Sequence, residues 1–71
     1  MAFDYSKLRG RVIEKYRTLG KFADAMNLSL HSVANKINDK QHWKQMEIIR
    51  AIKLLDIPVE KIGEYFFNEI S

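Results

Sequence analysis

The sequence of 71 residues lacks cysteine, has one proline and three glycines, and contains no long apolar run. The absence of cysteine excludes disulfides and thiolate metal sites, and it is compatible with a reducing cytoplasm. No stretch approaches the roughly 20 apolar residues of a membrane span. The N-terminal segment MAFDYSKLRGR also lacks the apolar core of a signal peptide. We therefore expect a cytoplasmic protein that does not contact a membrane.

Side chains that carry catalysis or bind metals are also sparse. His31 and His42 lack the i, i+4 spacing of a helical zinc site. Ser32 follows His31 directly, and neighbours on a helix point about 100° apart, so these two do not form a catalytic pair. The glycines are isolated, which excludes a phosphate-cradling loop. We expect no enzymatic activity, no metal, no cofactor and no small-molecule substrate.

What the chain does contain is typical of one small globular unit. It is 46% hydrophobic and 30% charged, which distinguishes it from a disordered chain. A chain of this length buries only about 60% of its unfolded surface, so we expect a thin core in a single domain over residues 1–71. Apolar residues at helical spacing predict five helices and no strand. The predicted helices cover about 5–16, two short segments within 18–37, about 45–55 and about 59–67. The residues predicted to face inward on the first, fourth and fifth helices are Tyr5, Leu8, Val12, Tyr16, Ile48, Ile49, Ile52, Leu55, Ile62 and Phe66.

The segment 18–37, TLGKFADAMNLSLHSVANKI, is the most informative part of the chain. Thr18 is a helix N-cap residue, and Phe22 and Met26 lie four residues apart on one face of the helix that follows. Ala23 beside them is small enough to let a second helix approach closely. Asn27 is the non-glycine residue that most readily adopts the left-handed conformation of a tight turn. The pattern predicts a helix that ends in a sharp corner.

A second helix of the same segment begins after that corner. Ser29 is its N-cap candidate, and Val33 and Ile37 form its buried stripe. The outward residues are predicted to be His31, Ser32, Asn35, Lys36 and Asn38. Two short helices joined in this way are a helix-turn-helix, although an ordinary helical hairpin within a small bundle has similar caps and apolar pairs.

Charge is concentrated in the half of the chain that holds this motif. The sequence through Lys44 has nine basic and four acidic residues, a net charge of +5, whereas the remainder has three basic and five acidic residues, a net charge of −2. A basic surface on the motif half favours a phosphate backbone through counterion release. The charge distribution therefore agrees with nucleic-acid binding.

These residues resemble the lambda-repressor-like DNA-binding domains of phage Cro/repressor (XRE-type) regulators. The resemblance is carried by TLGKFADAMNLS, by SVANKIN, and by the tail KQMEIIRAIKLLDIPVEKIGEYFF. It implies an all-α, five-helix domain with the helix-turn-helix at helices two and three. It also implies a phage- or prophage-encoded transcriptional regulator in the bacterial cytoplasm, a repressor or Cro-like protein. Such a protein binds double-stranded operator DNA as a homodimer, with helix three in the major groove.

The resemblance assigns DNA contacts to particular positions. The base-contacting positions are Leu30, His31, Ser32 and Asn35, and the phosphate-contacting positions are Thr18, Lys21, Lys36 and Lys40. Asn35 offers the donor and acceptor that match adenine, and His31 can pair with a guanine edge or a phosphate. Leu30 packs either on a thymine methyl or on a partner protein, and Ser32 serves a base, a phosphate or its own helix. For Lys21 and Lys36 the alternative is a solvated face.

Three positions depart from the family pattern. Asn27 replaces the usual turn glycine, and Asp39 stands where glycine commonly ends helix three. Lys36 occupies a place that is often apolar, so either it extends outward or helix three is rotated slightly.

The C-terminal segment EYFFNEIS has more apolar side chains than one short helix can bury. We expect Tyr65, Phe67 and Ile70 to contribute to a two-fold dimer interface. The alternative is that Phe67 folds back over the first helix beside Tyr5 and Tyr16.

A second class of function competes with DNA binding. A small helical protein-interaction module, an adaptor or anti-repressor, would use the same hairpin or the aromatic tail to bind another regulator or a polymerase subunit. The dependence of affinity on salt distinguishes the two functions. For a protein with four or five phosphate contacts, the logarithm of the binding constant falls with the logarithm of the salt concentration with a slope of roughly −4, whereas binding through apolar contacts hardly depends on salt.

Overall fold

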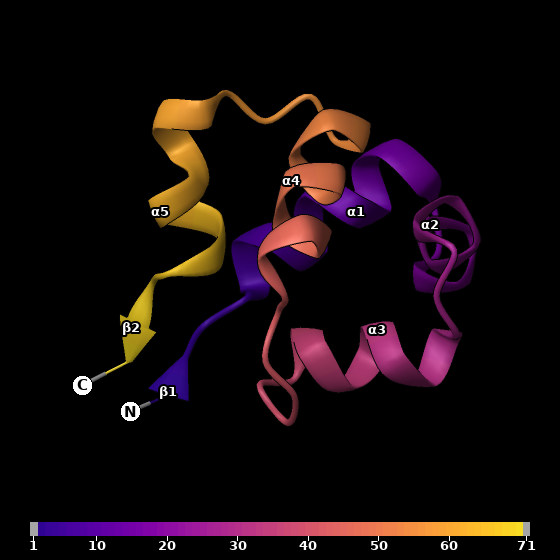
Figure 1. The fold of residues 1–71 in the computed structure, drawn as a ribbon, viewed down its shortest axis with the longest axis horizontal. Coiled ribbons are helices and arrows are strands. Elements are labelled where there is room, and N and C mark those ends of the chain that lie inside the picture. The colour runs from indigo at the N-terminus through magenta and orange to yellow at the C-terminus, as the bar shows by residue number, and fades with distance from the viewer. Residues whose placement is uncertain (1, 71) are drawn as a thin grey trace.

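The computed structural model describes residues 2–70. Within this range the chain forms five α-helices, one 3-10 helix and one two-stranded ribbon (Figure 1). The elements in chain order are β1 (Ala2–Phe3), α1 (Ser6–Tyr16), α2 (Leu19–Met26), α3 (Leu30–Ile37), α4 (Gln45–Leu54), η1 (Val59–Lys61), α5 (Ile62–Phe66) and β2 (Glu69–Ile70). The predicted all-α, five-helix class is confirmed. No helix of the described range is both long enough and apolar enough to cross a membrane.

The core lies where the five helices meet, and its largest fully buried side chains include Phe22, Phe66 and Leu8. The stripe predicted for the first helix is confirmed for Tyr5, Leu8 and Val12, which are buried, whereas Tyr16 is half-buried. On α5 the prediction was only half right. Phe66 is buried but Ile62 is half-buried, because a helix of five residues turns few positions toward the core.

The helix ends follow local chemistry with small shifts from the predicted bounds. α1 begins one residue later than predicted, and the Asp4 carboxylate accepts a hydrogen bond from the Ser6 backbone N–H at 2.9 Å. This bond lowers the pKa of Asp4. The predicted last helix is split in two, because Pro58 leads into a 3-10 turn, η1, before α5 begins at Ile62. Phe67 terminates α5 and lies outside it.

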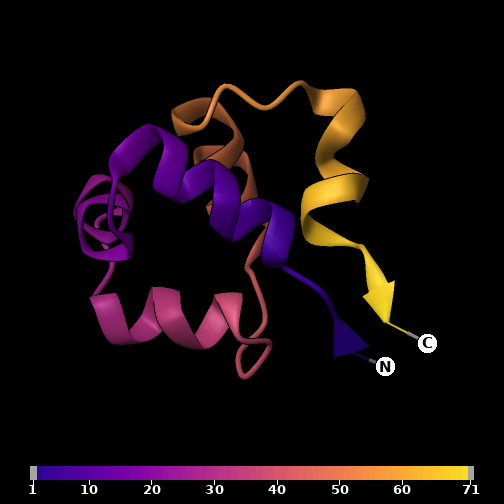
Figure 2. The same ribbon diagram turned by 180° about the vertical axis from the view of Figure 1, so that it is seen from behind.

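The terminal segments form an antiparallel ribbon that was not predicted. Ala2 pairs with Ile70 and Phe3 pairs with Glu69, which brings the two ends of the chain side by side (Figures 1 and 2). The Phe3 backbone N–H also donates to Asp39 Oδ2 at 3.1 Å. The ribbon is thereby attached to the loop that follows α3.

An aromatic cluster connects this ribbon to the core, beginning with Phe3 of β1, whose ring lies 6.2 Å from that of Tyr5. The Trp43 ring packs edge-on against Phe66, with centroids 5.2 Å apart, and lies 6.4 Å from the Tyr5 ring. Its indole N–H is buried and has no hydrogen-bond partner within residues 2–70. Trp43 therefore holds α5 against α1 by apolar contact alone.

Candidate functional site

The hairpin of α2 and α3 is built as the sequence predicts. Thr18 Oγ1 accepts from the Lys21 backbone N–H at 3.1 Å, and Ser29 Oγ accepts from the Ser32 N–H at 3.1 Å. Asn27 adopts the left-handed conformation, with φ 59° and ψ 41°. These local features are confirmed, because each depends only on residues within three or four positions.

The hairpin of α2 and α3 is held against the rest of the protein by buried side chains and by a hydrogen bond from α4. Phe22, Ala23 and Val33 are buried, and Ala23 is only 1% exposed at the approach of the two helices. The Arg50 guanidinium of α4 donates to the Met26 carbonyl oxygen at 2.8 Å. A cation at this point also interacts favourably with the C-terminal end of the α2 dipole.

The outer side of α3 combines one large apolar side chain with polar ones. Leu30 is 54% exposed and His31 is exposed, whereas Ser32 and Asn35 are half-buried. Asn35 Nδ2 lies 3.2 Å from His31 Nε2, so the two side chains hydrogen-bond to each other. We call Leu30, His31 and Asn35 the α3 surface. Its most prominent group is a leucine, which cannot hydrogen-bond to a base edge.

One of the four positions predicted to contact phosphate serves the fold instead. Thr18, Lys21 and Lys40 are exposed as expected, and Thr18 caps its own helix as an acceptor, which leaves its O–H as a donor. The prediction for Lys36 was wrong. Its side chain is buried, with the ammonium 3.5 Å from a carboxylate oxygen of Glu47 on α4. α3 turns this position toward α4, beside Ile37, and away from solvent.

Glu47 is a residue that the sequence analysis missed. Its carboxylate accepts from the Lys44 backbone N–H at 2.9 Å and so forms the glutamate half of a capping box at the start of α4; the Lys44 ammonium cannot accept the other bond. A glutamate three residues after an N-cap position is the signal for this role. Its second role, as the partner of Lys36, has no local signal.

The C-terminal apolar residues are partly exposed. Phe67 and Ile70 are each 54% exposed, and Tyr65 is half-buried. Phe67 packs edge-on against Phe3, 6.2 Å between centroids, and Phe3 in turn lies 6.2 Å from Tyr5, so Phe67 approaches the start of α1 through Phe3 and not by packing on Tyr5 and Tyr16 themselves. The dimer interface assigned to Tyr65, Phe67 and Ile70 stays a prediction, because contacts within one chain do not test it.

Potential metal ligands are dispersed. No group of three or more histidine, aspartate or glutamate side chains in residues 2–70 is arranged to hold a metal ion.

Together, the five helices, the terminal ribbon and the partly apolar α3 surface define a small all-α domain. The chain belongs to the family described as Protein of unknown function (DUF739), whose model matches residues 1–69. No curated protein matches the sequence. Among solved structures, the chain is similar to the modulator of repression (MOR) of the temperate bacteriophage TP901-1 from Lactococcus lactis. The two share 46% sequence identity with a TM-score of 0.81, over 96% of this chain and 92% of that chain.

This membership corrects the earlier assignment. The chain is not an XRE-type Cro/repressor regulator, and the prediction that it reads operator DNA through α3 was wrong. The resemblance was misleading because the caps and apolar stripe of a helix-turn-helix specify the hairpin and not its ligand. The expected alternative, a small helical protein-interaction module, agrees better with the match to a modulator of repression.

Proposed function

We propose that this protein modulates repression by binding a repressor protein, and that it does so in the cytoplasm of a bacterial host. The observation that carries the proposal is the 46% identity to the phage modulator of repression over almost the full length of both chains. At this identity and TM-score, the two chains share the fold.

The α3 surface supports a protein partner. A leucine that is 54% exposed beside polar side chains is typical of the apolar centre and polar rim of a protein interface. Burial of the Lys36 ammonium against Glu47 also removes one of the expected attachments to phosphate. We propose that Leu30 inserts into an apolar depression of the repressor.

A three-component binding assay tests this function. Purified repressors from the genome that encodes this chain are incubated with a labelled operator fragment, and the chain is then added. We expect the chain alone to leave the mobility of the DNA unchanged and to change the mobility of the repressor–DNA complex. A shift of the free operator by the chain alone, with a log–log salt slope near roughly −4, contradicts the proposal.

The variant Leu30→Ser tests the role that we propose for Leu30 in binding the repressor. The side chain is exposed, so the fold should be retained while affinity for the repressor falls about 10-fold, as for loss of one apolar anchor. Val59→Ser is the control, because Val59 is 71% exposed and lies in η1, a different element. Equal losses for the two variants would show that Leu30 has no special role.

A further inference from the structure

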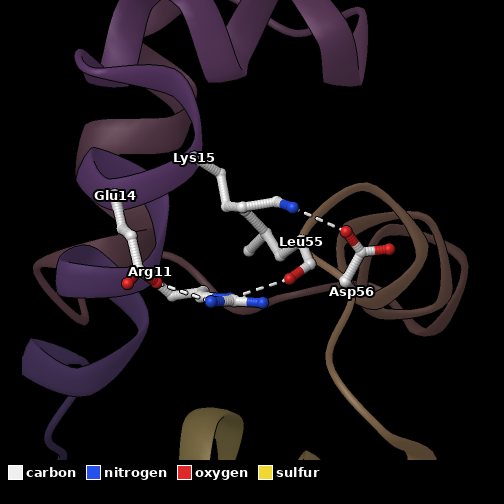
Figure 3. A network of polar contacts seen from close by, with 5 residues as sticks. All are labelled: Arg11, Glu14, Lys15, Leu55 and Asp56. Atoms are coloured by element: carbon white, nitrogen blue, oxygen red, sulfur yellow. Dashed lines mark hydrogen bonds and ion pairs between the residues drawn. The ribbon is translucent and has the colours of Figure 1, made fainter.

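α1 has two exposed sides that differ in their charges. On the side toward α4 and α5 its basic groups are paired, with N–O distances of 2.5–2.6 Å. The pairs are Lys7–Glu64, Arg11–Glu14 and Lys15–Asp56. Figure 3 shows the last two, together with the hydrogen bond from Arg11 Nε to the Leu55 carbonyl oxygen at 2.8 Å. These charges serve internal contacts.

The other side of α1 carries arginines without such partners. Neither Arg9 nor Arg17 forms an ion pair with any residue between 2 and 70. Between them lies Ile13, which is 41% exposed. At 100° per residue, Arg9, Gly10 and Ile13 fall within about 100° of one another around the helix. In Figure 2, α1 lies in front of α4 with no other element between it and the viewer.

Gly10 is not required by the fold. It lies in the interior of α1, it is exposed, and its φ is not positive. A Cβ added there would meet nothing within 4 Å. Glycine is among the least favourable residues inside a helix, and its usual justification is the close approach of another backbone. No neighbour between residues 2 and 70 makes that approach.

Arg17 is the opposite of Gly10, because it is a non-glycine residue at a position whose backbone conformation favours glycine. It ends α1 with φ 75° and ψ −40°, a region that favours glycine. The chain therefore has a glycine where the fold favours alanine and an arginine where the fold favours glycine. Both choices suit an external partner that approaches closely at Gly10 and carries negative charge.

A pocket adjoins the N-terminal end of this side of α1. Its volume is about 250 Å³, and its walls are partly apolar and partly polar. They are formed by Phe3, Tyr5, Ile37 and Ile70 together with Asp4, Ser6, Arg9 and Asn38. This volume is below the ~300 Å³ at which sites for drug-sized molecules begin, so the pocket suits a single side chain with an apolar body and a polar end. It lies between the terminal ribbon, the start of α1 and the end of α3.

We propose that this side of α1 docks an acidic amphipathic helix of the repressor. We call Arg9, Gly10, Ile13, Arg17 and the adjoining pocket the α1 surface. Carboxylates of the partner helix bind Arg9 and Arg17, its backbone passes close to Gly10, and one of its side chains with an apolar body and a polar end fills the pocket. The proposal rests on the proposed function, because it specifies how the repressor is held.

Gly10→Leu tests the close approach without weakening the fold. Repressor binding is measured by fluorescence anisotropy, and thermal unfolding by circular dichroism. We expect Kd to rise at least 10-fold while Tm does not fall, since the new side chain has space and favours the helix. Gly63→Leu in α5 is the matched control, because a Cβ at Gly63 also meets nothing within 4 Å, and its Kd should stay within about 2-fold of the wild type.

Charge is tested separately with Arg9→Glu and Arg17→Glu. Each should raise Kd about 10-fold, and the double variant should show a weaker dependence of Kd on salt than the wild type. Wild-type affinity in Gly10→Leu and Arg9→Glu, with loss in Leu30→Ser, would overturn the α1 surface and leave the proposed function intact. If the wild-type chain binds no repressor, both proposals fail.

Discussion

The ion pair between Lys36 and Glu47 is the main polar feature of the interior. The two side chains are 7% and 11% exposed, and their charged atoms lie 3.5 Å apart. Because Glu47 also accepts the Lys44 N–H, one carboxylate both caps α4 and compensates the buried ammonium. A buried charge that loses its partner is costly, and this makes the pair sensitive to single substitutions.

We expect Lys36→Met to lower the free energy of unfolding by about 3 kcal/mol, because the Glu47 carboxylate then remains buried without a cation. The double variant K36M/E47Q should recover more than half of this loss, since glutamine is neutral and its oxygen still accepts from Lys44. Urea denaturation followed by circular dichroism measures both values. A single variant as stable as the wild type would mean that the pair contributes nothing.

The sequence predicts the structural roles of some residues and not of others. Thr18, Asn27 and Ser29 were predicted correctly because their partners lie within a few positions along the chain. Lys36 was assigned to the outer face because its own helix does not reveal that a carboxylate of α4 lies opposite. The one indication was that this position is often apolar in the family that the chain resembles. For the proposed α1 surface the signal was Gly10, a glycine in the middle of the first predicted helix, where it disfavours the helix but does not by itself reveal a partner.

At the scale of elements, the first four helices end without glycine. Between residues 2 and 70, the residues with positive φ are Arg17, Asn27, Asp39 and Asp56, at 75°, 59°, 61° and 53°. Each lies at or just beyond the end of α1, α2, α3 or α4. Asparagine and aspartate tolerate this conformation because their short polar side chains bond locally. Of these ends, only that at Asn27 was predicted to be left-handed.

Asn27 provides a direct test of the hairpin turn. We expect Asn27→Ala to lower the free energy of unfolding by about 1 kcal/mol, because alanine is strained at positive φ. Asn27→Gly should stay within about 0.5 kcal/mol of the wild type, since glycine adopts this conformation freely. Both values come from chemical denaturation. Equal destabilisation by alanine and glycine would indicate that the Asn27 side chain, and not its backbone conformation, supports the turn.

The terminal ribbon is an element that sequence patterns cannot predict. Strands of two residues have no alternation to recognise, and the paired residues, Ala2 and Ile70, lie at opposite ends of the chain. The helices were predictable because their apolar periodicity is local and extends over several turns. The division of the last predicted helix into η1 and α5 depends on packing around Phe66 and was not predictable from spacing.

At the scale of the whole molecule, exposed ion pairs tie α1 to the C-terminal half. The hydrogen bond from Lys15 lowers the pKa of Asp56, and the hydrogen bond from Lys7 lowers the pKa of Glu64. A carboxyl with a lower pKa in the folded state stabilises the fold above its unfolded pKa, about 4. That contribution is lost as the pH falls through the folded-state pKa.

We therefore expect Tm to be nearly constant between about pH 6 and 8 and to decrease below about pH 4. In Lys15→Gln the decrease should be smaller, because Asp56 no longer has its cation. Added salt should reduce the difference between the wild type and this variant, since both partners are exposed. Identical pH profiles for the two proteins would contradict the role of this ion pair.

The central claim is that the protein binds a repressor and does not read DNA, and a nuclear magnetic resonance titration of the 15N-labelled chain tests it most directly. Purified repressor and its operator DNA are added in separate experiments at physiological salt. We predict that the repressor shifts amide signals of the α3 surface and of the α1 surface and that operator DNA alone shifts neither. Saturable shifts along α3 with DNA, and none with the repressor, would contradict the account.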